Sequence, residues 1–461
     1  MVARPASVTM VRRIMNALQS ALASLRTRAA ATPEQVRKRA FAILFVVSVT
    51  TAVGNNGMQS VLPAIGRQIG IPDFMVTAIY SLSALLWALS SPFWAKASDE
   101  RGRKPLILLG LGGFVVSMIA CGAVVSAGVR HMAAPMVIFV FFLLARSLFG
   151  LFGSAANPAS QAYIADQTTR EQRTQSMSTL AGAFGLGTIF GPLAATMFVL
   201  PIVGLSGPMF AFALIAAIVM GVVFWWLPES HPAKADTDSS STGMKPMKSG
   251  PFWMDPRLRP FLIYGFLAST CQTAMIQMLG FLIIDKVHLS PLAALDYIKM
   301  AMMTGAIAGL MAQWGLIRMF RMSPRHLLRW GAGLACAGSV IMALAPDYWT
   351  LVIAYTVSSL GFAFTRPGFT AGASLSVEQP EQASAAGAIA AVNGLNVILA
   401  PLFLLLYERF RPGPFVVSAV ILAGLTIYAY ANTSLRTVSD GATSEDEATE
   451  SLLEKGDEGA V

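Results

Sequence analysis

The chain has 461 residues, of which 55% are hydrophobic and only 12% are charged, and its mean hydropathy is +0.61. A soluble globular protein carries about a quarter charged residues. These values exclude a disordered chain, a coiled coil and a water-soluble enzyme. The apolar residues fall in stretches of about 20, each long enough to cross a hydrocarbon core of about 30 Å. The sequence therefore predicts an integral multi-pass membrane protein.

The net charge of +9 is unevenly distributed. Residues 1–40 hold eight Arg and Lys residues but one acid, Glu34, whereas residues 434–461 hold two basic and eight acidic residues. Oppositely charged tails on an apolar body predict solvated termini and no nucleic-acid partner.

Cofactor chemistry has no support in the pattern of reactive residues. The three cysteines lie inside apolar stretches, and the four histidines lie in loops or at span ends without metal-ligand spacing. No nucleophile with a base at workable spacing and no Gly-rich phosphate loop occurs. We therefore expect no disulfide framework, no metal, no cofactor and no enzymatic activity.

Twelve apolar stretches predict twelve membrane-spanning helices, because backbone polar groups in lipid must be bonded within their own segment. Their approximate limits are 41–65, 75–95, 105–128, 134–158, 176–200, 207–227, 260–284, 297–318, 327–345, 349–371, 385–407 and 413–431. Pro158 and Pro367 are 209 residues apart, and so are Pro192 and Pro401. These pairs stand at corresponding places in two sets of six spans, which favours a duplicated transporter half.

The predicted fold class is an all-α integral membrane protein with twelve helices in two six-helix halves. The expected regions are a basic N-terminal segment (1–40), a first half (41–227), a cytoplasmic linker (228–259), a second half (260–431) and an acidic tail (432–461). Lys and Arg are concentrated in the segments that share a side with the N-terminus, which predicts that both termini are cytoplasmic.

The N-terminal segment has three open interpretations. Ile14, Leu18, Leu22 and Leu25 fall on one helical face with arginines around it, which is typical of a surface helix on anionic lipid. An Arg-rich stretch without acids before Glu34 also resembles an organelle transit peptide, and a solvated tail is the third interpretation. We expect a plasma or inner membrane and leave an organelle membrane open.

The loop between the second and third spans reads AKASDERGRKPL at 95–106. Asp99 ends a helix, and a carboxylate at this boundary can engage the positive N-terminal end of a neighbouring helix. Gly102 permits a tight reversal, while Arg103 and Lys104 anchor the cytoplasmic face. By themselves, these charges are also consistent with a role that only sets the topology of the loop.

This loop resembles the signature of the major facilitator superfamily, Gly-x-x-x-Asp-Arg-x-Gly-Arg-Arg/Lys. Ala95 replaces the leading glycine here, and Glu100 replaces the usual basic residue. The resemblance implies a twelve-helix secondary transporter of the proton-antiporter-like branch. It also implies that Asp99, Gly102, Arg103 and Lys104 take part in gating. Asp99 would meet the start of the eleventh span, near Ala385, and hold the outward-facing state.

The fourth span contains Arg146 about 12 residues from its start, so about 18 Å deep. A guanidinium there costs several kcal/mol unless it faces a wet cavity or a partner. We expect it to contact a substrate anion, to couple protons, or both; a structural bridge is the alternative. The pattern from Arg146 to Gly150, followed by Asp166, Glu171 and Arg173, resembles the fourth helix of the superfamily, which adds Asp166 and Arg173 to the expected gating residues.

The fifth span contains Gly187, Gly191 and Pro192, which allow close helix contact and favour a kink. It resembles the Gly-x-x-x-Gly-Pro-x-x-Gly-Gly motif of the superfamily's antiporters, with Ala195 and Thr196 in place of the last two glycines. The resemblance implies export. Glycine-mediated helix packing without any bearing on direction is the alternative.

Polar side chains at midplane depth are candidates for substrate binding. They are Asn55, Asn56 and Gln59 in span one, Gln272 and Gln277 in span seven, and Asn393 and Asn396 in span eleven. The resemblance implies that spans one, four, seven and ten line a central cavity, which favours the first five. Hydrogen bonding between helices is the alternative for each of these amides. Arg366, nearer the cytoplasmic end of span ten, is a further candidate, with snorkelling to the membrane surface as its alternative.

No Asp or Glu occurs at midplane depth in any predicted span, since Asp166 and Asp285 lie near opposite ends. An exporter of cations commonly needs a buried carboxylate that exchanges a proton against the substrate. Here the buried charge is positive, which favours a neutral or anionic substrate with Arg146 as its counter-charge.

Three functions remain open. The first is a secondary transporter that exports a small amphipathic molecule, driven by the proton gradient, as residues 40–227 rock against 258–431. The second is a carrier of the same fold for an organic anion, such as a carboxylate metabolite or siderophore. The third is a non-transporting membrane receptor or assembly protein. The expected partners are a small-molecule substrate, protons and membrane lipid, and the protein is expected to be a monomer.

Overall fold

The computed structural model describes residues 33–168, 170–200, 203–229, 255–377, 381–433 and 435. Most of the expected basic segment, most of the expected linker and nearly all of the acidic tail lie outside the described residues. The three interpretations of the N-terminal segment therefore stay predictions.

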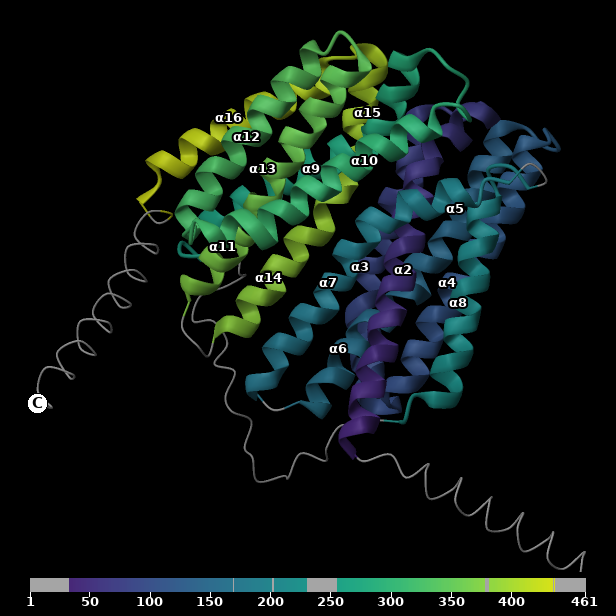
Figure 1. The fold of residues 1–461 in the computed structure, drawn as a ribbon, viewed down its shortest axis with the longest axis vertical. Coiled ribbons are helices and arrows are strands. Elements are labelled where there is room, and N and C mark those ends of the chain that lie inside the picture. Colours follow the sequence, from purple (N-terminus) through teal and green to yellow (C-terminus); the bar gives the residue numbers. More distant parts are fainter. Residues whose placement is uncertain are drawn as a thin grey trace, which may run out of the picture.

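The described helices form twelve rods, several of which are interrupted by a short non-α turn (Figure 1). The first six are α2 (Pro33–Ile69), α3 (Asp73–Arg101), α4 (Arg103–Val129), α5–η1–α6 (Pro135–Phe152, Gly153–Ala155 and Ala156–Gln167), α7 (Arg170–Met197) and α8 (Gly207–Trp226). The second six are α9 (Arg259–Val287), α10–η3–α11 (Leu295–Leu310, Met311–Leu316 and Ile317–Met319), α12 (Pro324–Leu344), α13 (Tyr348–Leu375), α14–η5–α15 (Gln382–Leu395, Asn396–Leu399 and Ala400–Arg409) and α16 (Gly413–Ala431).

Ten of these rods are long and apolar enough to cross a membrane. The other two are α7, of which Gly185–Met197 is the apolar part, and α14–η5–α15. Each of the twelve predicted spans overlaps one rod, so the predicted all-helical, twelve-helix fold is confirmed. The rods run past several predicted limits. For example, α2 begins at Pro33, so the basic residues just before the predicted span belong to the same helix.

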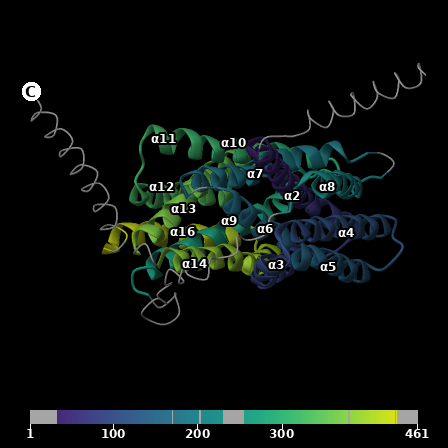
Figure 2. The ribbon, with the colours of Figure 1, turned by 90° about the horizontal axis from the view of Figure 1, so that it is seen from below.

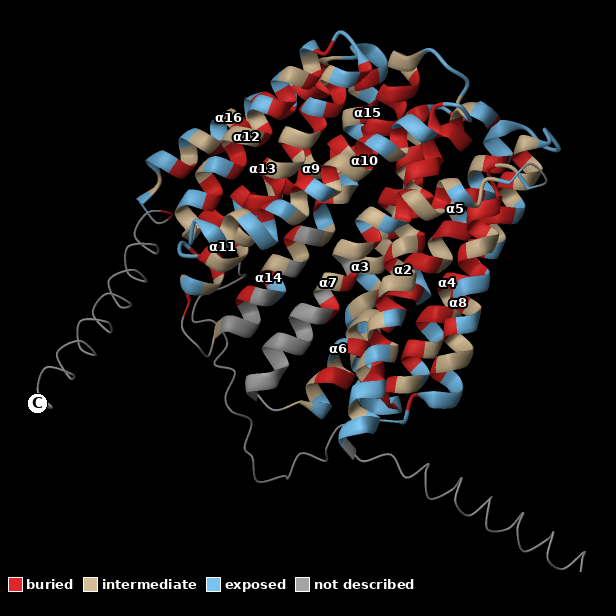
Figure 3. Cartoon of the chain, in the orientation of Figure 1, coloured by how far each residue is buried: buried red, intermediate tan, exposed pale blue. Residues whose placement is uncertain are grey.

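The surface of the bundle is apolar, as expected for helices in lipid. Large side chains such as Trp225, Trp314, Leu344 and Val420 are mostly exposed. Buried residues lie on the inward faces of the rods (Figure 3). The two halves lie side by side when seen along the bundle (Figure 2).

The two ends of the bundle differ in charge. One end, called the basic end below, carries most of the described Lys and Arg side chains: Arg37, Lys38, Arg39, Lys96, Arg101, Arg103, Lys104, Arg257, Arg259, Arg318, Arg321, Arg325 and Arg329. The opposite end, called the far end, carries the turns between α2 and α3 and between α9 and α10. The chain enters α2 and α9 from the basic end.

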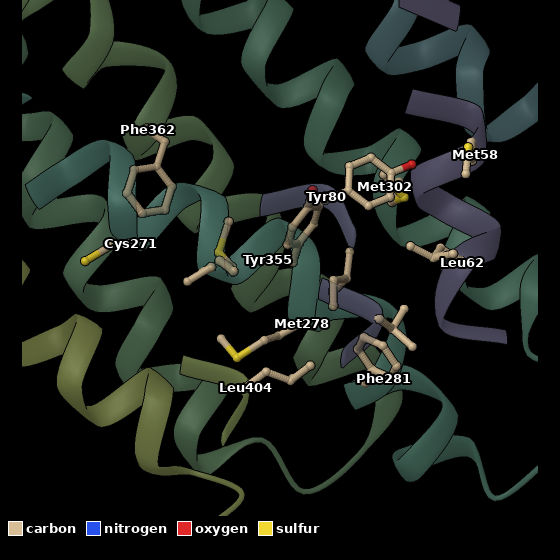
Figure 4. Packing of buried hydrophobic residues seen from close by; sticks show 14 of the residues in the cluster. Met58, Leu62, Tyr80, Cys271, Met278, Phe281, Met302, Tyr355, Phe362 and Leu404 are labelled. Carbon is tan, nitrogen blue, oxygen red and sulfur yellow. The ribbon is translucent and has the colours of Figure 1, made fainter. Parts of the chain in front are cut away.

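A buried apolar cluster joins the two halves in the middle and towards the far end. The first half contributes Met58, Leu62 and Tyr80, and the second half contributes residues such as Met278 and Tyr355 (Figure 4). The halves also lie close together where Gly280 of α9 meets Pro63 of α2, since a Cβ added at Gly280 would lie 2.5 Å from Pro63 Cγ.

The described hydrogen bonds between the two halves lie in the middle of the bundle or at the far end. Ser81 donates to the Val397 carbonyl at 2.7 Å, and Arg67 donates to Asp285 at 2.8 Å. Nearer the basic end, Gly182 of α7 and Gly387 of α14 have no described atom within 4 Å of an added Cβ. Contacts between the halves therefore close the far end, and the described residues form no such hydrogen bond at the basic end.

Candidate functional site

Arg146 is one of the most deeply buried charged side chains that the structure describes, with 2% exposed. It lies on α5, and its Nη2 donates a hydrogen bond to Asn55 Oδ1 on α2. Its Nε and Nη1 have no hydrogen-bond partner among the described residues. A buried donor left without a partner costs about 1–3 kcal/mol, and more when it is charged, so this guanidinium is under-satisfied in the observed state.

Two aromatic rings flank the Arg146 guanidinium. Its Cζ lies 4.9 Å from the centroid of Tyr80 and 4.5 Å from that of Phe149. Such contacts contribute about 2 kcal/mol when they are desolvated, so they offset part of the burial cost without supplying a counter-charge. Arg146 and Asn55, two of the predicted binding residues, therefore lie together in the structure.

The predicted amides of α2 and α9 lie at matching levels. Gln59 lies one turn from the Pro63–Gly280 contact, towards the basic end, and Gln277 of α9 lies about one turn from it on the same side. Gln277 is buried, and its Oε1 has no hydrogen-bond partner. Asn55 lies one further turn along α2 towards the basic end, on the same face as Gln59. Asn55, Gln59 and Gln277, which lie at successive or matching levels below the far end, are called the polar column below.

The other predicted amides do not share this environment. Asn56 donates to the carbonyl of Ala52 in its own helix at 2.8 Å, and its Cβ faces Gly191 of α7. Gln272 is half-buried. Asn396 accepts a hydrogen bond from Thr273 at 3.3 Å, which joins η5 to α9. Hydrogen bonding and packing between helices therefore describe Asn56 and Asn396 better than a binding role; the side chain of Asn393 lies outside the described ones.

Arg366 lies on α13 and is exposed although its neighbours Thr365 and Phe369 are buried. Its guanidinium makes no hydrogen bond or ion pair with the described residues. Arg366 and Arg146 are the two described charges that lie more than eight residues from an end of a spanning rod. Every described Asp and Glu lies within three residues of a helix end or outside the helices.

The predicted gating residues at the basic end lie together. Arg103 is buried and donates from Nη1 to Asp99, and from Nε to Asp166 Oδ2 at 3.0 Å. Arg103 thus ties the α3–α4 turn to the end of α6. Its contact with Asp99 lies within the first half, and the side chains of 382–384 are not described. The expected contact of Asp99 with the start of α14 therefore stays a prediction.

The backbone conformation and the close packing at position 102 explain why this residue is a glycine. Its φ of 95° is a conformation that L side chains rarely adopt, and an added Cβ would lie 2.7 Å from Glu229 Oε1. The same carboxylate accepts from the Lys104 backbone N–H at 3.2 Å. Glu229, which follows α8, is a contact that sequence reasoning did not find. Arg173 lies in the first turn of α7, and its side chain is not described.

The glycines of α7 allow it to touch α2, as predicted. A Cβ at Gly187 would lie 2.5 Å from Ala52 Cβ, and one at Gly191 would lie 2.7 Å from the backbone nitrogen of Gly57. Pro192 follows within the same helix. This contact lies inside the first half, so by itself it says nothing of transport direction.

Sequence reasoning missed an ionic cluster at the far end, called the far-end lock below. It consists of Arg67, Asp73, Asp285, Tyr407 and Glu408. Arg67 of α2 bonds Asp285 of α9 at 2.8 Å, and the Phe74 backbone N–H bonds Glu408 of α15 at 3.1 Å. Both contacts join the two halves. No group of three or more His, Cys, Asp or Glu side chains in the described part of the chain could hold a metal ion.

Twelve helical rods in two six-helix halves, ten of them long and apolar enough to cross a membrane, define the architecture of a secondary transporter. A family model described as the Major Facilitator Superfamily matches residues 44–401, and the chain belongs to this family. The protein is an integral multi-pass membrane transporter rather than an enzyme, as the sequence predicted.

The chain is 26% identical over 371 residues to multidrug resistance protein 1 of Bacillus subtilis, which covers 79% of this chain and 88% of that protein. It is 27% identical over 206 residues to the class B tetracycline resistance protein of Escherichia coli. This match covers only 43% of this chain and 46% of that protein. The fold matches a solved bacterial homologue of the human lysosomal transporter Spinster, in an inward-facing and unoccupied conformation. The TM-score is 0.66 at 14% identity, over 89% of this chain and 98% of that one.

Proposed function

We propose that this protein exports a small amphipathic molecule from the cytoplasm in exchange for protons, by alternating access. The observation that carries the proposal is Arg146, a guanidinium buried against aromatic side chains, with two nitrogen atoms, Nε and Nη1, that have no described hydrogen-bond partner. Intramembrane charges of this kind mark substrate and ion pathways. The relatives named for multidrug and tetracycline resistance support export of small molecules.

The orientation follows from charge. Positively charged residues favour the cytoplasmic side, so the basic end and both termini would face the cytoplasm, in a plasma or inner membrane. The closed far end then makes the observed state inward-facing, ready to take substrate from the cytoplasm. One six-plus-six bundle encloses the whole path, which supports a monomer surrounded by lipid.

The transport cycle would exchange contacts at the two ends. Opening the far end breaks the Arg67–Asp285 and Phe74–Glu408 contacts of the far-end lock. Closing the basic end brings together the open glycine surfaces of α7 and α14, and it would bring Asp99 to the start of α14. The polar column and Arg146 stay between the moving ends, so a bound molecule is exposed to one side at a time.

A carrier of organic anions is the second candidate. Both deep charges, Arg146 and Arg366, are positive, while the described carboxylates are confined to helix ends and loops. A carboxylate or sulfonate would satisfy the unpartnered donors of Arg146 with charge-assisted hydrogen bonds, which are about twice as strong as neutral ones. A cation would add to an uncompensated positive charge.

Proteoliposomes with a pH-sensitive dye inside test the proposal. The purified protein is given a panel of neutral, cationic and anionic amphiphiles, and proton movement is followed for the wild type and Arg146→Gln. Substrate-dependent proton movement that is lost in Arg146→Gln supports a proton-coupled exporter and identifies the charge class. Transport of an anion without proton movement supports the second candidate, and no transport of any compound contradicts both.

A further inference from the structure

We infer that Arg366 and the amides of Asn157 and Gln161 form an entry site for the anionic group of the substrate, between the basic end and Arg146. This inference rests on the proposed function and narrows its substrate class to amphipathic organic anions. Arg366 is exposed, without a described partner, and deep inside its rod. An exposed cation at this depth faces an aqueous space rather than lipid, because lipid contact would be costly.

The position of Arg366 on its helix indicates which way it faces. Ala363 lies beside Gly309 of α10, and Phe369 packs on Gly265 of α9. Arg366 is three residues from each, so at 100° per residue it lies about 60° from both directions, between them. It therefore faces the gap between α9 and α10, on the side where the second half meets the first. It does not face the outer surface of the bundle.

The first half places amides at the equivalent position. Asn157 precedes Pro158 as Arg366 precedes Pro367, and both pairs are 209 residues apart. Gln161 donates from Nε2 to Asn157 Oδ1 at 3.2 Å, and Gln161 is exposed although the helix around it is apolar or buried. Repeats related by an axis along the membrane normal place such residues on opposite walls of one space.

The two sets of residues also lie at the same depth. Arg366 is nine residues before Leu375, the last residue of α13, and Asn157 is ten residues before Gln167, the last residue of α6. At 1.5 Å per residue these positions are about 14 and about 15 Å inside their helix ends. Arg146 lies eleven residues before Asn157 in sequence, so about 16 Å further from the basic end.

The charges therefore form two levels of opposite exposure. The outer level holds the exposed Arg366, and the inner level holds the buried Arg146. In the repeat, the position equivalent to Arg366 is occupied by Asn157, and the position equivalent to Arg146 is occupied by Tyr355, 209 residues later. Each arginine is therefore matched by a neutral polar residue in the other half. No described carboxylate lies at either level. An anionic group is attracted to Arg366 first and then to Arg146, whereas a cationic substrate is repelled at both levels.

Binding to the full-length protein in nanodiscs tests the entry site. The probes are 2-naphthoate and its neutral counterpart 2-naphthylmethanol, measured by equilibrium dialysis. Wild type should bind 2-naphthoate about tenfold more tightly than the alcohol, and Arg366→Gln should weaken only the naphthoate by about five- to tenfold. Arg366→Lys should retain most of the affinity, and Gln161→Leu should lose a smaller part of it.

Salt dependence and a charge-matched control separate this site from other causes. Because Arg366 is exposed to water, its attraction is screened by salt, so naphthoate affinity should fall with ionic strength in wild type and less so in Arg366→Gln. Arg318→Gln removes an exposed charge at the basic end and should change neither probe. Equal affinity of wild type for both probes, unchanged naphthoate binding in Arg366→Gln, or equal loss for both probes would overturn the inference.

The proposed function fails separately. If naphthoate binding depends on Arg366 but no substrate moves protons in proteoliposomes, the entry site stands and proton coupling does not. If a neutral or cationic amphiphile drives proton movement that Arg366→Gln leaves unchanged, the exporter stands and the entry site for anions does not.

Discussion

Arg67 and Asp285 join the two halves at the far end, where Arg67 Nη1 donates to Asp285 Oδ1 at 2.8 Å across 218 residues of sequence. Arg67 also bonds Asp73 of its own half at 2.7 Å, and Tyr407 donates to Asp285 at 2.7 Å. The Arg67 guanidinium therefore binds two acids: Asp73, which belongs to the same half and moves with it, and Asp285, which belongs to the other half. Of the two contacts of Arg67, opening the far end breaks only the one with Asp285, so Arg67 keeps Asp73 and Asp285 keeps Tyr407 as polar partners.

We predict that Asp285→Asn shifts the protein towards a state that is open at the far end. The amide keeps an acceptor for Tyr407 but loses the charge attraction to Arg67. For a half-buried pair this contributes about 1–2 kcal/mol, which is roughly a tenfold change in population. Spin labels at Arg130→Cys and Ser290→Cys, in a background without the native cysteines, should show a larger share of long distances.

The matched control for this change is Asp296→Asn. Asp296 pairs with Lys299 on its own helix at the same end of the bundle, so it holds no contact between the halves. It should leave the distance distribution unchanged. An unchanged distribution in Asp285→Asn as well would show that apolar contacts, such as Pro63 with Gly280, close the far end alone.

Substitution by alanine should destabilise the protein at one glycine of α7 and leave its stability unchanged at another. Gly191→Ala places a Cβ 2.7 Å from the Gly57 backbone nitrogen and 2.9 Å from the Val53 carbonyl oxygen, and backbone cannot move aside easily. We expect it to lower the free energy of unfolding by about 1–3 kcal/mol. Gly182→Ala meets no described atom within 4 Å and should leave the melting temperature in detergent unchanged. Equal melting temperatures for both variants would contradict the close contact between α7 and α2.

The sequence predicted the class of fold and the deepest charge but not the pairing between halves. Counting residues was enough to place Arg146 near the midplane, because a spanning helix has a fixed rise. Arg67 and Asp285 lie near span ends, where a charge needs no partner to be tolerated, so nothing local indicated that they meet. Asn55 and Asn56 show a similar limit: they are 100° apart on one helix, and only the packing of α7 on α2 shows which faces the cavity.

The loop before α9 should make stability depend on pH. Arg257 donates to both carboxylate oxygens of Asp255, and these hydrogen bonds hold the pKa of Asp255 below its ordinary value. Because the pKa is lower in the folded than in the unfolded state, the stabilisation is fully present above the unfolded-state pKa. It is lost as the pH falls through the folded-state value.

Arg257→Gln should therefore raise the pKa of Asp255 and shift the acid-induced fall in melting temperature to higher pH. Arg257 also bonds Glu381 at 3.2 Å, which adds a tie between the starts of α9 and α14. Melting temperatures in detergent from about pH 7 to about pH 3 measure the shift. Arg259→Gln, an exposed neighbour without a described carboxylate partner, is the control and should follow the wild-type curve.

Arg146→Met should separate stability from transport. The change keeps an apolar stem of similar length and removes a buried cation whose Nε and Nη1 are unpartnered. Replacing buried charge by apolar volume is often neutral or stabilising by about 1–4 kcal/mol, so we expect an equal or higher melting temperature together with loss of substrate-dependent proton movement. Arg329→Met is the matched control, because Arg329 bonds the Ala429 carbonyl at 3.2 Å and lies 4.3 Å from the Tyr430 ring.

That control should show the opposite pair of effects, a lower melting temperature with transport retained, since Arg329 is satisfied by α16 near the basic end. If Arg146→Met instead melts at a clearly lower temperature, the guanidinium stabilises the contact of α2 with α5 through Asn55. It would then be a structural bridge. A stable variant that still moves protons would exclude Arg146 from coupling altogether. Equal stability with lost transport is the result expected of a site that keeps an unsatisfied charge for its ligand.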